Sequence, residues 1–147
     1  MGSFALDLQA FADKAGALAD AVIRETMVHI TTVIDDRSPV GDATYWKSKP
    51  PKGYVGGHFR ANWQLGVGEI PGGVVPGHDY GVTLSANTGK LPQDAAGKMF
   101  YLANNVPYAQ RIEDGWSHQH PAPQAVVGRT VTEFQDIVKA AVAKVAT

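Results

Sequence analysis

The fold of this 147-residue chain is decided by a stretch that reads Asn104-Asn105-Val106-Pro107-Tyr108-Ala109-Gln110-Arg111-Ile112-Glu113-Asp114-Gly115-Trp116-Ser117. Pro107 suits the first position of a helix, where its missing N–H is harmless. Gly115 suits the left-handed position just past a helix end. The stretch therefore predicts a turn, a short helix from Pro107 to about Glu113, and a stop at Gly115.

Three large apolar side chains recur in this stretch at four-residue spacing. Tyr108, Ile112 and Trp116 would share one helical face. We expect Tyr108 and Ile112 to pack in the core. Trp116 follows the glycine stop, so we expect it at an interface with a partner.

Short segments before this stretch predict strands. Residues 58–68 alternate apolar and polar side chains with the period of a strand, and residues 80–84 alternate again. Residues 99–103 form a short apolar run that suits a buried strand. Residues 85–98 are small and polar, which predicts a loop. The expected sheet is small and mostly antiparallel, with hairpin-like connections.

Two amphipathic helices flank the predicted strands. Residues 4–34 repeat apolar side chains at spacings of three and four, and Ser38 before Pro39 stops the helix. Residues 127–145 repeat in the same way, with Thr130 or Thr132 as the expected N-cap. This order of elements predicts a single α+β domain over residues 1–147, with the helices packed on one face of the sheet.

A second long loop is predicted at residues 38–57, where prolines and glycines punctuate the chain. It contains Tyr45, Trp46 and Tyr54. Aromatic side chains in such a loop are candidate anchors for a partner. They can equally fold back over the core, and the sequence leaves both options open.

The composition narrows the class of protein. Hydrophobic residues make up 44% of the chain, charged residues 18%, and the formal net charge is −1. This charge balance disfavours nucleic-acid binding as the main role, because phosphates require a basic surplus. The absence of cysteine excludes disulfides and thiolate chemistry. No apolar run approaches the ~20 residues of a membrane span, and no signal peptide is evident.

Catalytic and metal-binding patterns are weak. His118 and His120 would point the same way on an extended segment, but no third ligand is evident. Glu113 is expected to pair with Arg111, Arg60 or a neighbouring subunit rather than to act as an acid or base. The glycines fit neither a phosphate-binding loop nor a dinucleotide fingerprint. We therefore expect no enzyme activity, no cofactor and no metal.

Arg60 and Trp63 would face opposite sides of the strand predicted at residues 58–68. Trp63 is expected to pack into the core with Phe59. Arg60 would then point toward solvent or a partner.

Three segments form a combined pattern. The first is Ser38-Pro39-Val40, the second is Gly57-His58-Phe59-Arg60-Ala61-Asn62-Trp63, and the third is Asn104-Asn105-x-Pro107-Tyr108-Ala109-x-x-Ile112-Glu113-x-Gly115-x-Ser117-x-Gln119. Together, and in their order along the chain, they resemble the tail-completion (minor tail protein Z-like) family of long-tailed bacteriophages. The insertion at residues 41–56 departs from the family pattern, as does His120-Pro121-Ala122-Pro123, where family members usually carry an Ala-Pro and a Gly.

The resemblance implies a structural virion protein at the head–tail junction, assembled in the host cytoplasm. Such proteins form rings, often of six subunits, and contact other neck and tail proteins. No membrane and no specific nucleic acid are implied, although DNA passes through such a ring. We expect the contacts in loops 38–57 and 85–98, with the candidate interface residues Tyr45, Trp46, Tyr54, Arg60, Glu113 and Trp116.

Other functions compete with this interpretation. A tail terminator or a head-closure ring would differ from this interpretation in the place of the ring along the neck and tail, not in the kind of contacts that the chain makes. A small hydrolase would use His118, His120 and Glu113. A toxin–antitoxin or DNA-associated module is disfavoured by the charge balance.

Overall fold

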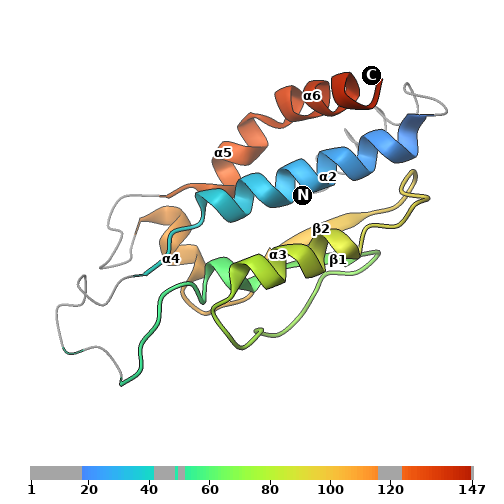
Figure 1. The fold of residues 1–147 in the computed structure, drawn as a ribbon. Helices are drawn as coiled ribbons and strands as arrows, with labels where there is room; N and C mark the ends of the chain where they lie inside the picture. The colour runs from blue at the N-terminus through green and yellow to red at the C-terminus, as the bar shows by residue number, and fades with distance from the viewer. Residues whose placement is uncertain (1–17, 42–48, 50–51, 116–123, 147) are drawn as a thin grey trace.

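The computed structural model describes residues 18–41, 49, 52–115 and 124–146 (Figure 1). The predicted α+β class is confirmed. The described elements are helices α2 (Ala19–Arg37), α3 (Tyr80–Gly89), α4 (Ala109–Asp114), α5 (Val126–Thr132) and α6 (Phe134–Ala146), the 3₁₀ turn η3 (Arg60–Asn62), and strands β1 (Trp63–Val67) and β2 (Phe100–Asn104).

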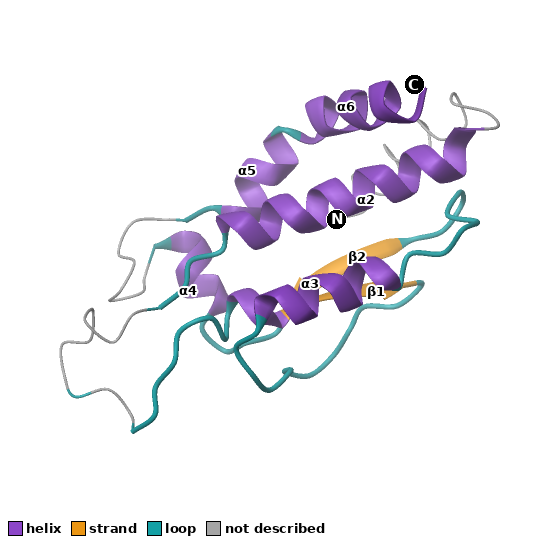
Figure 2. Cartoon of the chain, in the orientation of Figure 1, coloured by secondary structure: helices purple, strands orange, loops and turns teal. Residues whose placement is uncertain are grey.

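Helix α2 runs through the middle of the described part of the molecule. Helices α5 and α6 pack along one side of it, and α3 and the strand pair lie on the other (Figures 1 and 2). The predicted apolar face is confirmed in this region, where Val22, Met27, Ile30 and Ile34 are buried. The prediction for residues 4–17 lies outside the described residues.

Helix α2 ends at Arg37, three residues later than predicted. Ser38 takes an extended conformation before Pro39, as the residue before a proline tends to do. The Ser38 N–H still bonds back to the Asp35 carbonyl over 3.1 Å. Ser38 and Pro39 therefore end the helix as predicted, and Ser38 is the first residue after it.

The described sheet consists of two antiparallel strands, with a register that runs from Trp63 opposite Asn104 to Val67 opposite Phe100. The strand predicted at residues 99–103 is confirmed to within one residue. The strand predicted at 58–68 begins only at Trp63. The chain before it forms a tight turn, in which the Ala61 N–H bonds to the Gly57 carbonyl over 2.8 Å.

The strand predicted at residues 80–84 is wrong, because this segment is the first half of α3. The predicted loop at 85–98 is wrong up to Gly89 for the same reason. Asp79 caps the helix by accepting a hydrogen bond from the Val82 N–H over 3.0 Å. Asn87 is the buried residue of α3, so no apolar helical face marks this segment in the sequence. The alternation of apolar and small or polar side chains over residues 80–84 therefore led to the wrong prediction of a strand.

Asn87 explains why this mostly exposed helix lies against the sheet. Its side-chain oxygen accepts from the Leu65 N–H over 3.1 Å, and its side-chain nitrogen donates to the Trp63 carbonyl over 2.5 Å. The Lys90 ammonium adds a bond to the Leu65 carbonyl over 3.3 Å. One side-chain amide thus supplies β1 with the donor and acceptor that a third strand would have supplied.

The C-terminal segment is two helices rather than one, with a break at Glu133. Thr130 and Thr132 are not N-caps, contrary to the prediction. Their hydroxyls bond to the carbonyls of Val126 and Gly128, four residues earlier inside α5. The predicted apolar seam is confirmed on α6, where Phe134, Val138 and Ala141 are buried, and Ile137 is buried beside them. The prediction is wrong for Val131 of α5, which is 50% exposed.

The loop between β1 and α3 is held by side-chain amides. Asn62 is fully buried and bonds both the N–H and the carbonyl of Val75, over 2.7 Å and 2.9 Å. Gln64 and Asn105 both donate to the Gly73 carbonyl. The loop is therefore held in place by side chains of residues within and beside the strand pair.

No described helix is long and apolar enough to cross a bilayer.

We predict that Asn87→Ala lowers the free energy of unfolding by about 2–3 kcal/mol, because the Leu65 N–H and the Trp63 carbonyl lose their partners. Urea denaturation followed by circular dichroism measures this. The control is Ser85→Ala on the exposed side of α3, which should change stability by less than about 0.5 kcal/mol. Equal effects of the two substitutions would contradict the role given to Asn87.

Candidate functional site

The end of α2 meets η3 through an ionic cluster centred on Arg60. The Arg60 Nε lies 3.1 Å from an Asp35 oxygen, and its Nη2 lies 3.2 Å from an Asp36 oxygen. The guanidinium also lies 4.0 Å from the centre of the Tyr80 ring, in cation–π geometry. Arg60 therefore connects α2, η3 and the start of α3. The expectation that it projects from a strand is wrong.

Asp35 is the buried member of this cluster, with 3% of its surface exposed. Burial raises the pKa of the Asp35 carboxyl above its usual value, and Asp36 adds to this, although Arg60 acts in the opposite direction. A buried carboxylate is costly unless it is paired and hydrogen-bonded. The position of Arg60 is therefore set by the charge it compensates.

Trp63 joins the same helix end to the strand pair. Its indole N–H donates to the Ser38 hydroxyl over 2.7 Å, and that hydroxyl donates to the Ile34 carbonyl over 2.7 Å. The Trp63 ring meets Phe59 edge-to-face, with ring centres 5.7 Å apart. The predicted packing of Trp63 with Phe59 in the core is confirmed.

The short helix α4 begins at Ala109, two residues after the predicted start at Pro107, and it ends as predicted. Gly115 takes the left-handed conformation, with φ of 89°, and its N–H bonds to the Arg111 carbonyl over 2.9 Å. Ile112 is buried as expected. Tyr108 differs from the prediction, because 39% of its surface is exposed.

Glu113 caps helix α5 from outside that helix. One carboxylate oxygen accepts from the Val127 N–H over 3.1 Å and the other from the Gly128 N–H over 3.0 Å. Ala125, the residue at the N-cap position, has no side-chain cap bond, so Glu113 supplies it. This differs from the expected pairing with Arg111 or Arg60.

The backbone reinforces the junction between α4 and α5. The Gln124 N–H bonds to the Ile112 carbonyl and the Ala125 N–H to the Glu113 carbonyl, each over 3.1 Å. Ala125 has a φ of 46°, a conformation that costs a residue with a side chain about 1 kcal/mol or more. The hydrogen bonds around it hold that conformation in place.

Other residues of the sequence pattern also have structural positions. Gly57 has a φ of 107°, and a side chain there would meet the His78 carbonyl at 2.8 Å. Asn105 donates to the Pro71 and Gly73 carbonyls, each over 3.0 Å. Pro107 is exposed just before α4, and Pro39 is partly buried just after α2.

The candidate interface residues are only partly described. Tyr54 is partly exposed and lies near Tyr108. Burial raises the pKa of the Tyr108 hydroxyl above its usual value, and the nearby Tyr54 adds to this shift. Arg60 and Glu113 both have partners within the chain. The following lie outside the described residues: Tyr45, Trp46, Trp116, Ser117, His118, Gln119 and His120.

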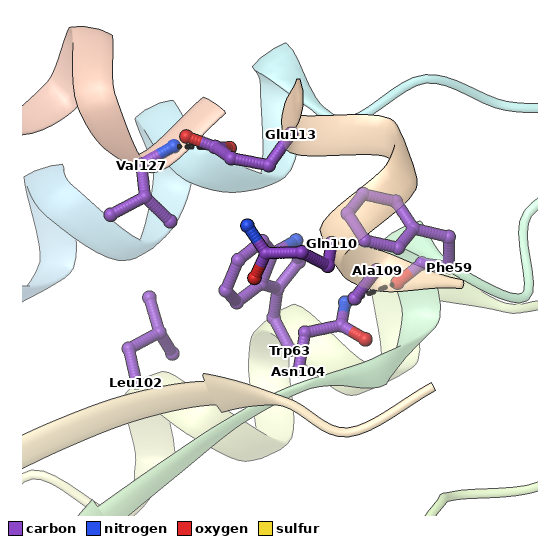
Figure 3. A pocket seen from close by; sticks show the side chains of 8 residues that line it. All are labelled: Phe59, Trp63, Leu102, Asn104, Ala109, Gln110, Glu113 and Val127. Atoms are coloured by element: carbon purple, nitrogen blue, oxygen red, sulfur yellow. Dashed lines mark hydrogen bonds between the residues drawn. The ribbon is translucent and has the colours of Figure 1, made fainter. Parts of the chain in front are cut away.

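A pocket of about 210 Å³ opens between α4, the start of α5 and the strand pair (Figure 3). Its apolar lining includes Trp63, Leu102 and Val127, and Gln110 and Glu113 contribute polar groups. Glu113 is already bonded to the α5 backbone, as Figure 3 shows. Within the described residues, no group of three or more His, Asp or Glu side chains could hold a metal ion.

Sequence reasoning missed the amides that organise this region, namely Asn62, Asn87 and Asn104. Asn104 donates to the Phe59 carbonyl over 2.9 Å and accepts from the Val106 N–H. Each amide replaces a backbone partner at an irregular point of the chain. The only signal in the sequence is an asparagine at or near the end of an apolar segment.

Comparison of the chain with known protein families, curated proteins and solved structures gave no match.

We predict that Arg60→Ala destabilises the protein by about 2–3 kcal/mol at neutral pH, because Asp35 remains buried and unpaired. The loss of Arg60 raises the Asp35 pKa further. Since protonation removes the buried charge, the destabilisation should shrink as the pH falls through that raised pKa. Denaturation of both proteins across the acid range measures this difference.

The control for this experiment is Arg111→Ala, on the exposed side of α4. It should change stability by less than about 0.5 kcal/mol, with no such pH dependence. An Arg60→Ala effect that is constant with pH would refute the pairing with Asp35.

We predict that Glu113→Gln lowers the free energy of unfolding by about 1–2 kcal/mol. A glutamine side chain offers one acceptor oxygen for two N–H groups, and it carries no negative charge to interact with the positive N-terminal end of the α5 dipole. Thermal unfolding measures the loss. The neighbouring exposed substitution Asp114→Asn is the control and should have a much smaller effect. Equal stability of Glu113→Gln and the original protein would rule out the capping role.

Proposed function

We propose that this chain is a structural protein of a tailed-bacteriophage virion, which forms a ring at the neck or tail end where head and tail join. The observation that carries the proposal is the pattern from Asn104 to Gln119, together with the two shorter segments before it. Proteins of the family that the chain resembles commonly form rings, often of six subunits. The other partners of this chain would be neck and tail proteins.

The roles of the pattern residues support a structural protein. Glu113 caps α5, Gly115 ends α4, and Asn105 fixes the loop after β1. These residues maintain one shape of the backbone around the α4–α5 junction. A protein that stacks in a virion requires such a fixed shape at its contacts, because ordered interfaces lose less entropy on assembly.

The surface opposite α5 and α6 also supports the proposal. It is formed by the segment 70–89, which comprises the loop before α3 and α3 itself (Figure 1). The only formal charge in this segment is Asp79, which caps α3. Ile70, Val74 and Val82 are exposed by 67%, 47% and 66%. Depletion of charge is typical of the centre of a protein interface.

This surface complements the loop contacts predicted from the sequence. Tyr54 and the exposed apolar residues of segment 70–89 are the described side chains best suited to a neighbour. Arg60 and Glu113 act first within the chain, and in a ring contact they would contribute through their exposed edges. A head-to-tail ring joins two different patches of the same chain, so segment 70–89 would form one of them.

The test is complementation of a phage whose copy of this gene is disrupted. We predict that disruption gives filled heads and separate tails, and that the original gene restores infectious particles. Val82→Asp should fold but fail to restore infectivity, because it places a charge in an apolar contact. Val82→Thr keeps the shape without the charge and should restore it.

Electron microscopy and mass spectrometry of the purified particles decide the outcome. The proposal requires the protein to be present in the virion at the head–tail junction. Normal joining of heads and tails without the gene, or absence of the protein from purified particles, would overturn it.

A further inference from the structure

Two histidines that are distant in the sequence lie side by side in the fold. His58 precedes η3 and His78 precedes α3, and these two elements pack against each other. The centres of the two imidazole rings are 5.8 Å apart, and the ring planes are tilted by 58°. His58 is partly exposed and His78 is exposed, so an ion in the solvent can reach the pair. Only folding brings these rings together, because β1 and the loop before α3 separate them along the chain.

The hydrogen bonds of His58 decide which of its ring nitrogens carries the hydrogen. Its Nδ1 lies 2.9 Å from the Gly77 carbonyl oxygen. A carbonyl oxygen only accepts, so Nδ1 is the donor in this bond. The Asn62 amide lies 3.4 Å from Nδ1 but does not donate to it, because its two N–H groups donate to the carbonyls of His58 and Val75. In the neutral ring the free lone pair is therefore on Nε2.

This arrangement is typical of a histidine that binds a metal ion. A ligating imidazole usually donates its other N–H to a backbone carbonyl or a carboxylate, which fixes the ring and its tautomer. Gly77 supplies this carbonyl to His58. Two imidazole nitrogens at about 2.0–2.1 Å from one zinc ion place the ring centres on the order of 5 Å apart, so the ring of His78 would have to move by less than about 1 Å.

The His78 ring has the freedom that this movement requires. The residue is exposed, and no hydrogen bond from a described residue holds its ring, whose one described contact is with the His58 ring. The His58 ring is thus the fixed ligand of the pair, and the His78 ring is the adjustable one.

The charges beside the pair favour a cation. Arg60 lies near the two rings and would repel a metal ion, but Asp35 and Asp36 pair with its guanidinium. Asp79 adds a third carboxylate, and one of its oxygens caps α3. Three carboxylates thus accompany one guanidinium, and the resulting negative balance attracts a divalent cation.

We propose that His58 and His78 bind a zinc ion through one ring nitrogen each, which for His58 is Nε2. Imidazole nitrogen is a common zinc ligand, and zinc in proteins is mostly four-coordinate. The described residues offer no third ligand, so water completes the coordination and the affinity is modest. The expectation of no metal rested on spacing along the chain, which does not reveal a pair formed by folding. The site goes beyond the proposed function and does not depend on it.

The test is a zinc titration of the full chain by calorimetry and by NMR of the histidine rings. The starting protein carries His118→Asn and His120→Asn, which remove the other candidate pair in the sequence. It should bind one zinc ion, which shifts the Nε2 resonance of His58 while Nδ1 keeps its hydrogen. Zinc at about a hundredfold excess over its Kd should raise Tm by roughly 5–10 °C. Magnesium, which prefers oxygen ligands, should have neither effect.

Further variants of this starting protein identify the ligands. His58→Asn places an amide where Nδ1 stood, so it keeps a donor for the Gly77 carbonyl and removes Nε2. This variant and His78→Asn should each fold, as circular dichroism would show, and bind zinc at least about tenfold more weakly. His29→Asn on α2 is the matched control and should bind zinc as the starting protein does.

Three results would overturn the proposal. The first is a starting protein that binds no zinc, including the case in which the original chain binds it through His118 and His120. The second is unchanged zinc affinity in His58→Asn or His78→Asn. The third is coordination through Nδ1 of His58. If His58→Asn fails to fold, His78→Asn decides the outcome, because no hydrogen bond among the described residues involves the His78 ring.

Discussion

The contact between Asn87 and the outer edge of β1 is the interaction on which the arrangement of this sheet depends. A pair of five-residue strands has two open edges, and a two-stranded ribbon alone is marginally stable in water. Asn87 closes one edge by bonding to Leu65 and Trp63 in the manner of a third strand. The helix that carries it has little other buried surface. This amide fixes α3 against β1, while Asn62, Gln64 and Asn105 hold the loop that leads to it.

The end of α2 is the second point of organisation. Asp35 and Asp36 pair with Arg60 of η3, the Ser38 hydroxyl accepts a hydrogen bond from the Trp63 indole N–H, and Arg37 bonds to Thr130 of α5 and to Glu133. Four consecutive residues, 35–38, thus bond to three different parts of the chain. Glu113 then fixes α5 to α4. The region that carries the sequence pattern is therefore a structural junction, which agrees with a protein whose role is to hold one shape in an assembly.

The sequence predicted the elements whose signals are local or periodic. Gly115 marked the end of α4 because glycine acts through its own backbone conformation. Pro107 marked the approach to the helix but not its first residue, which is Ala109. The periodic apolar side chains of α2 and α6 marked their buried faces. Helix α3 was missed because Asn87 is its buried residue, and one buried amide has no periodicity. The partners of Arg60 and Glu113 are separated from them by 14 to 25 residues, and no rule of local spacing reaches that far.

The central claim is that Asn87 closes the outer edge of β1, whereas no described residue outside β1 bonds to the outer edge of β2. Amide hydrogen exchange of the dilute original protein, resolved by residue, tests both halves together. The Leu65 N–H should exchange slowly, near the limit set by global unfolding, because Asn87 accepts from it. The Leu102 N–H, for which no described residue supplies an acceptor, should exchange much faster, although the two residues lie opposite each other in the same sheet. Equal protection of the two amides, or slower exchange at Leu102, would contradict the account.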